Sequence, residues 1–131
     1  MIDLERFETI VSELLDELPE AFFLELSGGV LISDEAPQPA YAKTDDIYVF
    51  GEYRVSKLGR QVVVYKGSYD RLYPNADEGF LRRDLRRVIR HEFRHHMEFL
   101  SGIHGSKSLE AEDERAKRDY LRRHERLKGD N

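Results

Sequence analysis

The residues best suited to chemistry form the short segment His91-Glu92-Phe93-Arg94-His95. On an α-helix, residues four apart lie one turn apart on the same face, so the two imidazoles can converge on one ion. The carboxylate beside the first histidine can then accept a proton from a water molecule at that ion. Because the chain contains no cysteine, a transition metal must be held by His, Asp or Glu. The spacing H-E-x-x-H is typical of zinc-dependent hydrolysis.

A long amphipathic helix is expected to carry this segment. Asp77 suits the N-terminal cap and Gly102 the C-terminal cap, so the helix is predicted to run from about Asp77 to Ser101. A rotation of about 100° per residue gathers one apolar stripe toward the core. The stripe consists of Leu85, Val88, Ile89, Phe93 and Leu100.

The two histidines lie at the margin of this stripe. The same rotation places His91 and His95 side by side and Glu92 on the buried side of the pair. His96 points into the apolar arc, which favours a place in the core or behind the ligands over direct metal binding. The competing interpretation is a charged helix whose histidines hydrogen-bond at the surface or pair with Glu92 and Glu98. We favour the metal site because the motif lies at the core-facing margin of the helix.

A third ligand would complete the site and leave one position open for water or substrate. The candidates lie beyond the glycines that follow the helix, and they are His104, Glu110, Glu112, Asp113 and Glu114. Acids grouped in this way are more often the solvated face of a helix. The spacing alone therefore leaves the third ligand open.

Elements before the long helix must position it. Apolar residues from Leu4 to Leu18 recur at steps of three and four, which predicts an amphipathic helix stopped by Pro19. A shorter helical piece is expected over Ala21 to Leu26, followed by a strand at Val30 to Ile32. The segment from Asp34 to Asp46 is expected to be a loop.

Two further strands are expected in the middle of the chain. Ile47 to Phe50 and Gln61 to Tyr65 are rich in β-branched and aromatic residues, and we expect them to pair in a small sheet. Tyr69 to Tyr73 is expected to form a helical turn. A last charged helix is expected over Leu109 to Leu127. The order of elements predicts an α+β fold in which the small sheet packs against the long helix.

Length and composition predict one domain spanning residues 1–131, with a frayed tail at about 128–131. No stretch approaches the roughly 18 apolar residues of a membrane-spanning helix. The first residues lack the pattern of an export signal, so a cytoplasmic location is expected. The oligomeric state is left open.

Charge is divided unevenly along the chain. Residues 1–50 hold twelve acids and two bases, whereas a group of arginines follows in the long helix. That group is Arg82, Arg83, Arg86, Arg87, Arg90 and Arg94. It raises the alternative of a nucleic-acid binder, but the net charge of −5 counts against it. We expect the arginines to pair with the acidic first helix or to stay solvated.

The sequence resembles the small bacterial minimal-zincin family of zinc metallopeptidases over most of residues 1 to about 121. The resemblance rests on four stretches, of which the doubled histidine after H-E-x-x-H is the most specific. They are Leu18-Pro19-Glu20, Gly51-Glu52-Tyr53-Arg54, Val63-Val64-Tyr65-Lys66 and Val88 to His96. The resemblance implies a compact zincin-like fold and one Zn²⁺ per chain, with His91 and His95 as ligands and Glu92 as catalytic base.

The chain departs from the family after the second histidine. Glu98 and Ser101 stand where family members with a short linker have a glycine and the aspartate ligand. A longer insertion, from Ser101 to Ser108, leads to the acidic segment. Matching Asp113 and the two residues after it to the family's aspartate segment implies Asp113 as third ligand, with Glu110, Glu112 and His104 in reserve.

These features predict hydrolysis of a peptide or protein substrate by a zinc-activated water, with Glu92 as general base. If the fold is zincin-like, the strand at Val62–Tyr65 is expected at the sheet edge, where it pairs with an extended peptide. The alternative is a catalytically silent metal-binding module with a regulatory or interaction role. A nucleic-acid binder built on the arginine helix is the third hypothesis.

Overall fold

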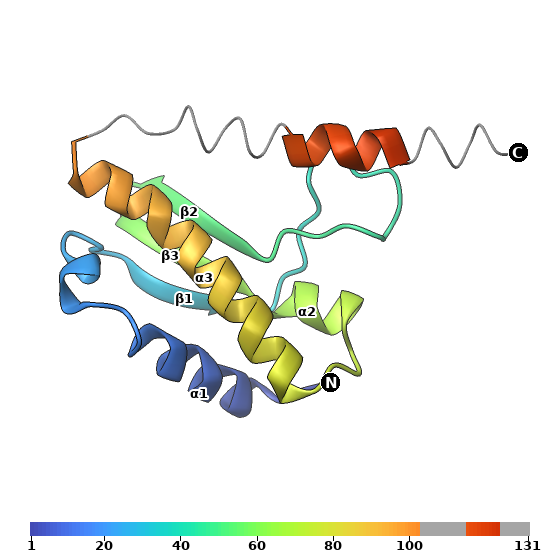
Figure 1. The fold of residues 1–131 in the computed structure, drawn as a ribbon, viewed down its shortest axis with the longest axis horizontal. Helices are drawn as coiled ribbons and strands as arrows, with labels where there is room; N and C mark the ends of the chain where they lie inside the picture. The colour runs from blue at the N-terminus through green and yellow to red at the C-terminus, as the bar shows by residue number, and fades with distance from the viewer. Residues whose placement is uncertain (103–114, 124–131) are drawn as a thin grey trace, which may run out of the picture.

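The computed structural model describes residues 1–102 and 115–123, which form a three-stranded sheet with helices packed on it (Figure 1). The helix α3 crosses one face of the sheet, and α1 lies beside it. The α+β class predicted from the order of elements is confirmed. The elements are α1 (Leu4–Leu15), the 3₁₀ helix η1 (Glu20–Phe23), β1 (Gly29–Ser33), β2 (Gly51–Ser56), β3 (Gly59–Tyr65), α2 (Lys66–Leu72), α3 (Glu78–Leu100) and a helix at 115–123.

The strand order is β1-β3-β2, so β3 is the central strand. It pairs in parallel with β1 and antiparallel with β2, to which a tight turn joins it. The expected edge position of Val62–Tyr65 is therefore wrong, and β2 is the edge strand packed on α3. The error arose because β1, distant in sequence, pairs with the other side of β3, and no local pattern reveals such a pairing.

The predicted strand at Ile47–Phe50 is also wrong. Those residues form no strand, and β2 begins immediately after them at Gly51. The Val49 N–H donates to the Pro37 carbonyl at 2.8 Å, and the Val49 carbonyl accepts from the Ser68 hydroxyl at 2.5 Å. The backbone groups of Val49 that a ladder would pair are thus paired with the preceding loop and with α2. The apolar composition of this segment reflects burial, since Tyr48 is 8% exposed.

The helix α3 has nearly the predicted bounds. The Asp77 carboxylate caps it by accepting from the Phe80 N–H at 2.8 Å, and Gly102 follows its end with a left-handed φ of 73°. The first helix ends at Leu15, before the predicted Leu18, and η1 is shorter than the piece expected over Ala21 to Leu26. The core forms between α1, α3 and the inner face of the sheet, and includes Phe7, Ile10, Val62, Val64, Leu85, Ile89 and Phe93.

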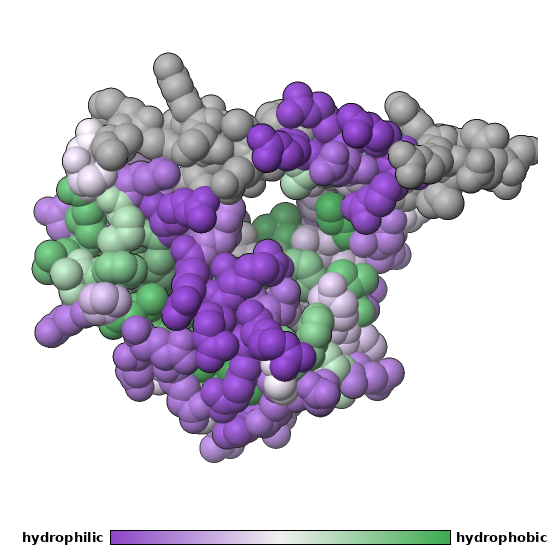
Figure 2. Space-filling model, in the orientation of Figure 1, coloured by the Kyte–Doolittle hydropathy of each residue, from purple (hydrophilic) through white to green (hydrophobic). Residues whose placement is uncertain are grey.

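Three of the six arginines of α3 pair with acids of α1, as expected, and Arg87 pairs with Asp84 of α3 itself. Arg82 lies 2.6 Å from the carboxylate of Glu13, and Arg86 lies 2.9 Å from that of Glu17. Arg90 reaches Glu17 as well, at 3.5 Å. Figure 2 shows strongly hydrophilic surface across the face where α3 lies in Figure 1. Both helices contribute to one ionic seam along their shared surface.

The helix at 115–123 is joined to the loop before β2. The Tyr120 hydroxyl donates to Asp46 Oδ1 at 2.7 Å and accepts from the backbone N–H of Lys43 at 3.2 Å. Tyr120 is 2% exposed, and its ring also packs against Tyr41. This part agrees with the helix expected over Leu109 to Leu127, whose remainder lies outside the described residues. Among the described helices, none has the length and apolar character needed to cross a membrane.

Candidate metal centre

Side chains that can ligate a metal converge at the middle of α3. One ligand atom each from His91, Glu92 and His95 lie within 4.8 Å of one another. The two imidazole centroids are 5.6 Å apart, and the rings are almost perpendicular. Glu92 is buried at 8% exposure, whereas both histidines are half-buried. The predicted placement of the histidines at the margin of the buried face, with Glu92 inside it, is confirmed.

Gly51 allows the start of β2 to approach this cluster closely. A Cβ atom at that position would lie 2.6 Å from Val88 Cγ1 and 3.1 Å from Glu92 Cγ. The first of these separations is too short for carbon atoms, so any side chain would push the strand and helix apart. The glycine therefore lets β2 cover Glu92 and reduce the contact of its carboxylate with solvent.

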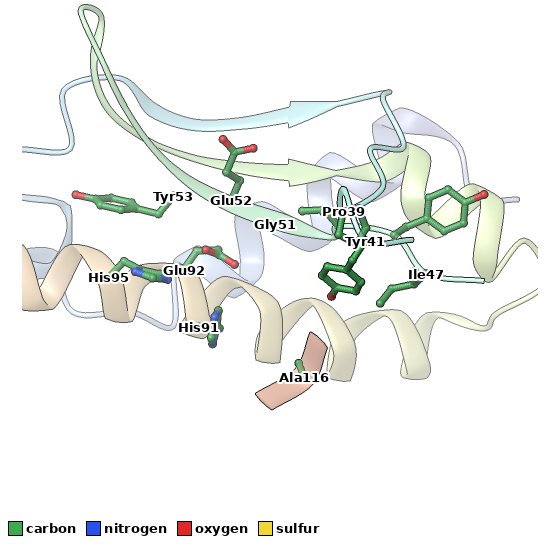
Figure 3. A pocket seen from close by; sticks show the side chains of 12 residues that line it. Pro39, Tyr41, Ile47, Gly51, Glu52, Tyr53, His91, Glu92, His95 and Ala116 are labelled. Carbon is green, nitrogen blue, oxygen red and sulfur yellow. The ribbon is translucent and has the colours of Figure 1, made fainter. Parts of the chain in front are cut away.

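Tyr53 lies opposite His95, two residues further along β2 (Figure 3). The rings of Tyr53 and His95 are nearly parallel, with centroids 5.9 Å apart. The Tyr53 hydroxyl lies 2.7 Å from Nδ1 of His96, which is fully buried as expected from its place on the helix. Sequence reasoning did not single out Tyr53 as a site residue. Its alternation with Gly51 along one strand would have signalled the shared face, but the strand was placed four residues too early.

A pocket of about 450 Å³ opens in front of the cluster. This volume lies within the usual range for sites that bind small ligands or side chains. One wall is apolar and aromatic, and the three cluster residues lie along α3 (Figure 3). The lining consists of Pro39, Tyr41, Ile47, Tyr48, Val49, Gly51, Glu52, Tyr53, His91, Glu92, His95 and Ala116.

The carboxylate of Glu52, although part of the lining, is held away from the cluster (Figure 3). It accepts a hydrogen bond of 2.7 Å from the Tyr65 hydroxyl, which itself accepts from Arg54 at 3.2 Å. Burial, with the nearby Glu52 carboxylate, raises the pKa of Tyr65 to about 12. The phenol therefore stays protonated near neutral pH and keeps Glu52 bound on the far face of the sheet.

The candidates for a third ligand lie outside the described residues. This applies to Asp113, the residue implied by the family resemblance, and to His104, Glu110, Glu112 and Glu114. The described chain resumes at residue 115, and Ala116 lines the pocket. The structure thus brings the chain just after Asp113 to the wall of the candidate site.

The chain is similar to a solved structure, the conserved hypothetical protein TTHA0227 from Thermus thermophilus. The two share 32% sequence identity with a TM-score of 0.62, over 76% of this chain and 98% of that one. This chain belongs to the same family as the Thermus protein. No protein-family model and no curated protein sequence matches the chain. The relative is a conserved hypothetical protein with no stated activity, so the basis for a function is the site itself.

Proposed function

We propose that this chain is a zinc-dependent metallopeptidase of the minimal-zincin type. The observation that carries the proposal is the convergence of His91, Glu92 and His95 at a pocket, with their ligand atoms within 4.8 Å of one another. Two imidazoles with carboxylate ligands form a donor set that catalytic zinc uses in proteins. The lack of cysteine in the chain agrees with such a site.

The residues of the cluster have two different roles, metal binding and proton transfer. His91 and His95 would hold the ion from consecutive turns of one rigid helix, which fixes the separation of their Cα atoms. Zinc bound there supplies a Lewis acid that polarises a carbonyl and acidifies water. Glu92, held beneath β2 by close packing at Gly51, accepts a proton from the attacking water and passes it to the leaving amine.

Asp113 is the proposed third ligand. Ala116 lines the pocket three residues later in the chain. Because one residue spans at most ~3.6 Å, the Cα atoms of these two residues are within about 11 Å of each other. Glu112 and Glu110 are farther along the chain from this anchor and His104 much farther, whereas Glu114 is one residue nearer. The family resemblance is what favours Asp113 over Glu114.

The proposed substrate is an extended peptide. The edge strand β2 lies beside the cluster, and a peptide placed next to an edge strand gains backbone hydrogen bonds. The apolar wall formed by Pro39, Tyr41 and Ile47 suits an uncharged, bulky side chain next to the scissile bond. Specificity would then depend on this wall, and general affinity on the strand.

The proposal is tested by replacing the general base. We expect the Zn²⁺-loaded wild-type protein to cleave members of a mixed peptide library, and Glu92→Gln to cleave them at least about a hundredfold more slowly. Zinc content should stay at the wild-type level, because Glu92 acts on the water and does not hold the ion. Glu98→Gln makes the same change on the same helix outside the cluster, and it should retain wild-type cleavage.

The outcomes separate the candidate functions. Equal cleavage by wild type and Glu92→Gln would contradict the role of Glu92. One bound Zn²⁺ per wild-type chain without cleavage of the library would favour the catalytically silent metal-binding module. Steeply salt-dependent binding of DNA or RNA that persists in His91→Ala would favour the nucleic-acid binder.

A further inference from the structure

A chain of part-buried hydrogen bonds, followed by a ring contact, connects the end of η1 to the candidate metal centre. His96 has both ring nitrogens in contact, with Nε2 lying 2.6 Å from the Leu24 carbonyl and Nδ1 lying 2.7 Å from the Tyr53 hydroxyl. The Tyr53 hydroxyl also accepts a hydrogen bond from Arg60 at 3.2 Å. The ring of Tyr53 then stacks on His95. These contacts run from the backbone after η1 to one proposed ligand.

The chemistry of the partners fixes the direction of each hydrogen bond. A carbonyl oxygen can only accept, so Nε2 of His96 carries the proton that is donated to Leu24. In the neutral ring Nδ1 is then an acceptor, and the Tyr53 hydroxyl donates to it. The arginine can only donate, so Arg60 supplies the second contact to the same oxygen. With the neutral ring, the Tyr53 proton is directed at His96 and away from the pocket.

Arg60 is itself held firmly in place. Its guanidinium carbon lies 3.2 Å from the centroid of the Phe99 ring, and that ring stacks on His96 at 5.9 Å. A cation over an aromatic face is an attractive arrangement. Both partners of the Tyr53 hydroxyl are thus fixed by contacts with the last turns of α3. The orientation of the Tyr53 ring is set from two directions.

We infer that Tyr53 is a positioning residue that fixes the ring of His95 for metal binding, with His96 and the Leu24 carbonyl as its support. The inference rests on the proposed metal site. It gives the doubled histidine a role in which only His95 faces the ion, while His96 holds the stacked tyrosine. It also assigns the Tyr53 hydroxyl to ligand orientation and not to stabilising a reacting oxyanion.

Tyr65 provides a matched control on the same sheet. Its hydroxyl also donates to one side chain and accepts from an arginine, Glu52 and Arg54 respectively. Tyr53 pairs with Val62, and Tyr65 follows Val62 by three residues on β3. Successive side chains of a strand point to opposite faces, so Tyr65 faces the opposite side of the sheet from Tyr53. Removing either hydroxyl deletes two hydrogen bonds, but only the Tyr53 hydroxyl belongs to a ring that stacks on a histidine.

The test measures Zn²⁺ affinity by competition with a chromogenic chelator, using the full chain. We expect Tyr53→Phe to weaken the affinity by about tenfold and Tyr53→Leu by up to about a hundredfold, as found for residues that orient metal ligands. Tyr65→Phe should stay within about twofold of wild type, since its hydroxyl has no contact with the histidines. The visible spectrum of bound Co²⁺ should change for both Tyr53 variants and not for Tyr65→Phe. Thermal unfolding of the metal-free proteins separates a loss of fold from a loss of ligand order.

Each outcome bears on a different statement. Wild-type affinity and an unchanged Co²⁺ spectrum in Tyr53→Phe and Tyr53→Leu would overturn the positioning role and leave the metal site intact. An equal loss of affinity in Tyr65→Phe and Tyr53→Phe would also overturn it, because the effect would then be one of general stability. Absence of Zn²⁺ binding by the wild-type protein would overturn the proposed function, and this inference with it. Should Tyr53→Leu fail to fold, Tyr53→Phe decides alone.

Discussion

The two margins of the buried face of α3 both carry polar residues, but they differ in what those residues meet. On the margin facing α1, Arg82, Arg86 and Arg90 contact acids of α1, and the opposite charges offset each other. On the margin facing β2, His91 and His95 converge with Glu92 at a pocket. The first arrangement joins two helices. The second gathers side chains that can ligate a metal around a pocket that can hold a substrate.

The difference shows why a run of charge is weaker evidence of function than a convergence of ligands. Six arginines are the most conspicuous feature of the α3 sequence, yet exposed ion pairs contribute little to stability. The histidines are fewer, and packing at Gly51 and Tyr53 restrains the side chains next to them. The following experiments test this contrast, in order of decreasing expected effect.

The largest effect is expected for the ligands themselves. His95→Ala and Asp113→Ala should each reduce zinc from about one ion per chain to nearly none, because three protein ligands are needed for tight binding. Arg86→Ala, from the opposite margin of α3, should keep the full amount. Elemental analysis after equilibration with Zn²⁺ and removal of unbound metal measures the content. Full zinc in both ligand variants would contradict the proposed ligand set.

An intermediate effect is expected at Gly51. The new methyl group of Gly51→Ala overlaps Val88 and should lower the free energy of unfolding by about 1–3 kcal/mol, as overpacking does. Displacement of Glu92 should also slow peptide cleavage. Chemical denaturation and library cleavage measure the two effects. In the control variant Gly79→Ala, near the start of α3, the new Cβ atom meets nothing closer than 3.3 Å, so cleavage should stay unchanged. Wild-type stability in Gly51→Ala would show that β2 has room to shift.

The smallest effect is expected on the ionic margin. The hydrogen bond and charge of Arg86 lower the pKa of Glu17, so this carboxylate stabilises the folded state above pH 4.5 and loses that effect as the pH falls through its lowered pKa. Arg86→Gln should therefore lower the melting temperature at pH 7 by about 1–4 °C. The difference from wild type should shrink progressively as the pH falls below 4.5, which thermal scans at pH 7 and at a series of acidic pH values can measure. A constant difference across that range would indicate a packing effect in place of an ionic one.

Local signals were sufficient for the long helix. A capping aspartate, a glycine past the end and a period of 3.6 residues depend on neighbours in the sequence, and α3 has nearly the bounds they predicted. The burial of Glu92 and His96 followed from the same rotation. The third ligand stays a prediction because Asp113 lies outside the described residues.

Local signals failed in the sheet. Ile47–Phe50 has the composition of a strand, but its backbone groups find partners in Pro37 and Ser68, far from it in sequence. The central place of β3 depends on the parallel pairing with β1, which was equally hidden. Tyr53 was overlooked for the same reason, since its face of β2 is defined only once the strand is correctly placed.

The sequence by itself determined which donors can meet a metal, because a spacing of four residues on a helix sets the separation of the His91 and His95 backbones whatever surrounds them. Only the tertiary structure decided what holds those donors in place. The contacts of Tyr53 with His95 and His96, and of Gly51 with Glu92, join segments about forty residues apart. Such contacts arise from the packing of a strand on a helix, and the free energy that selects this packing is spread over the whole core.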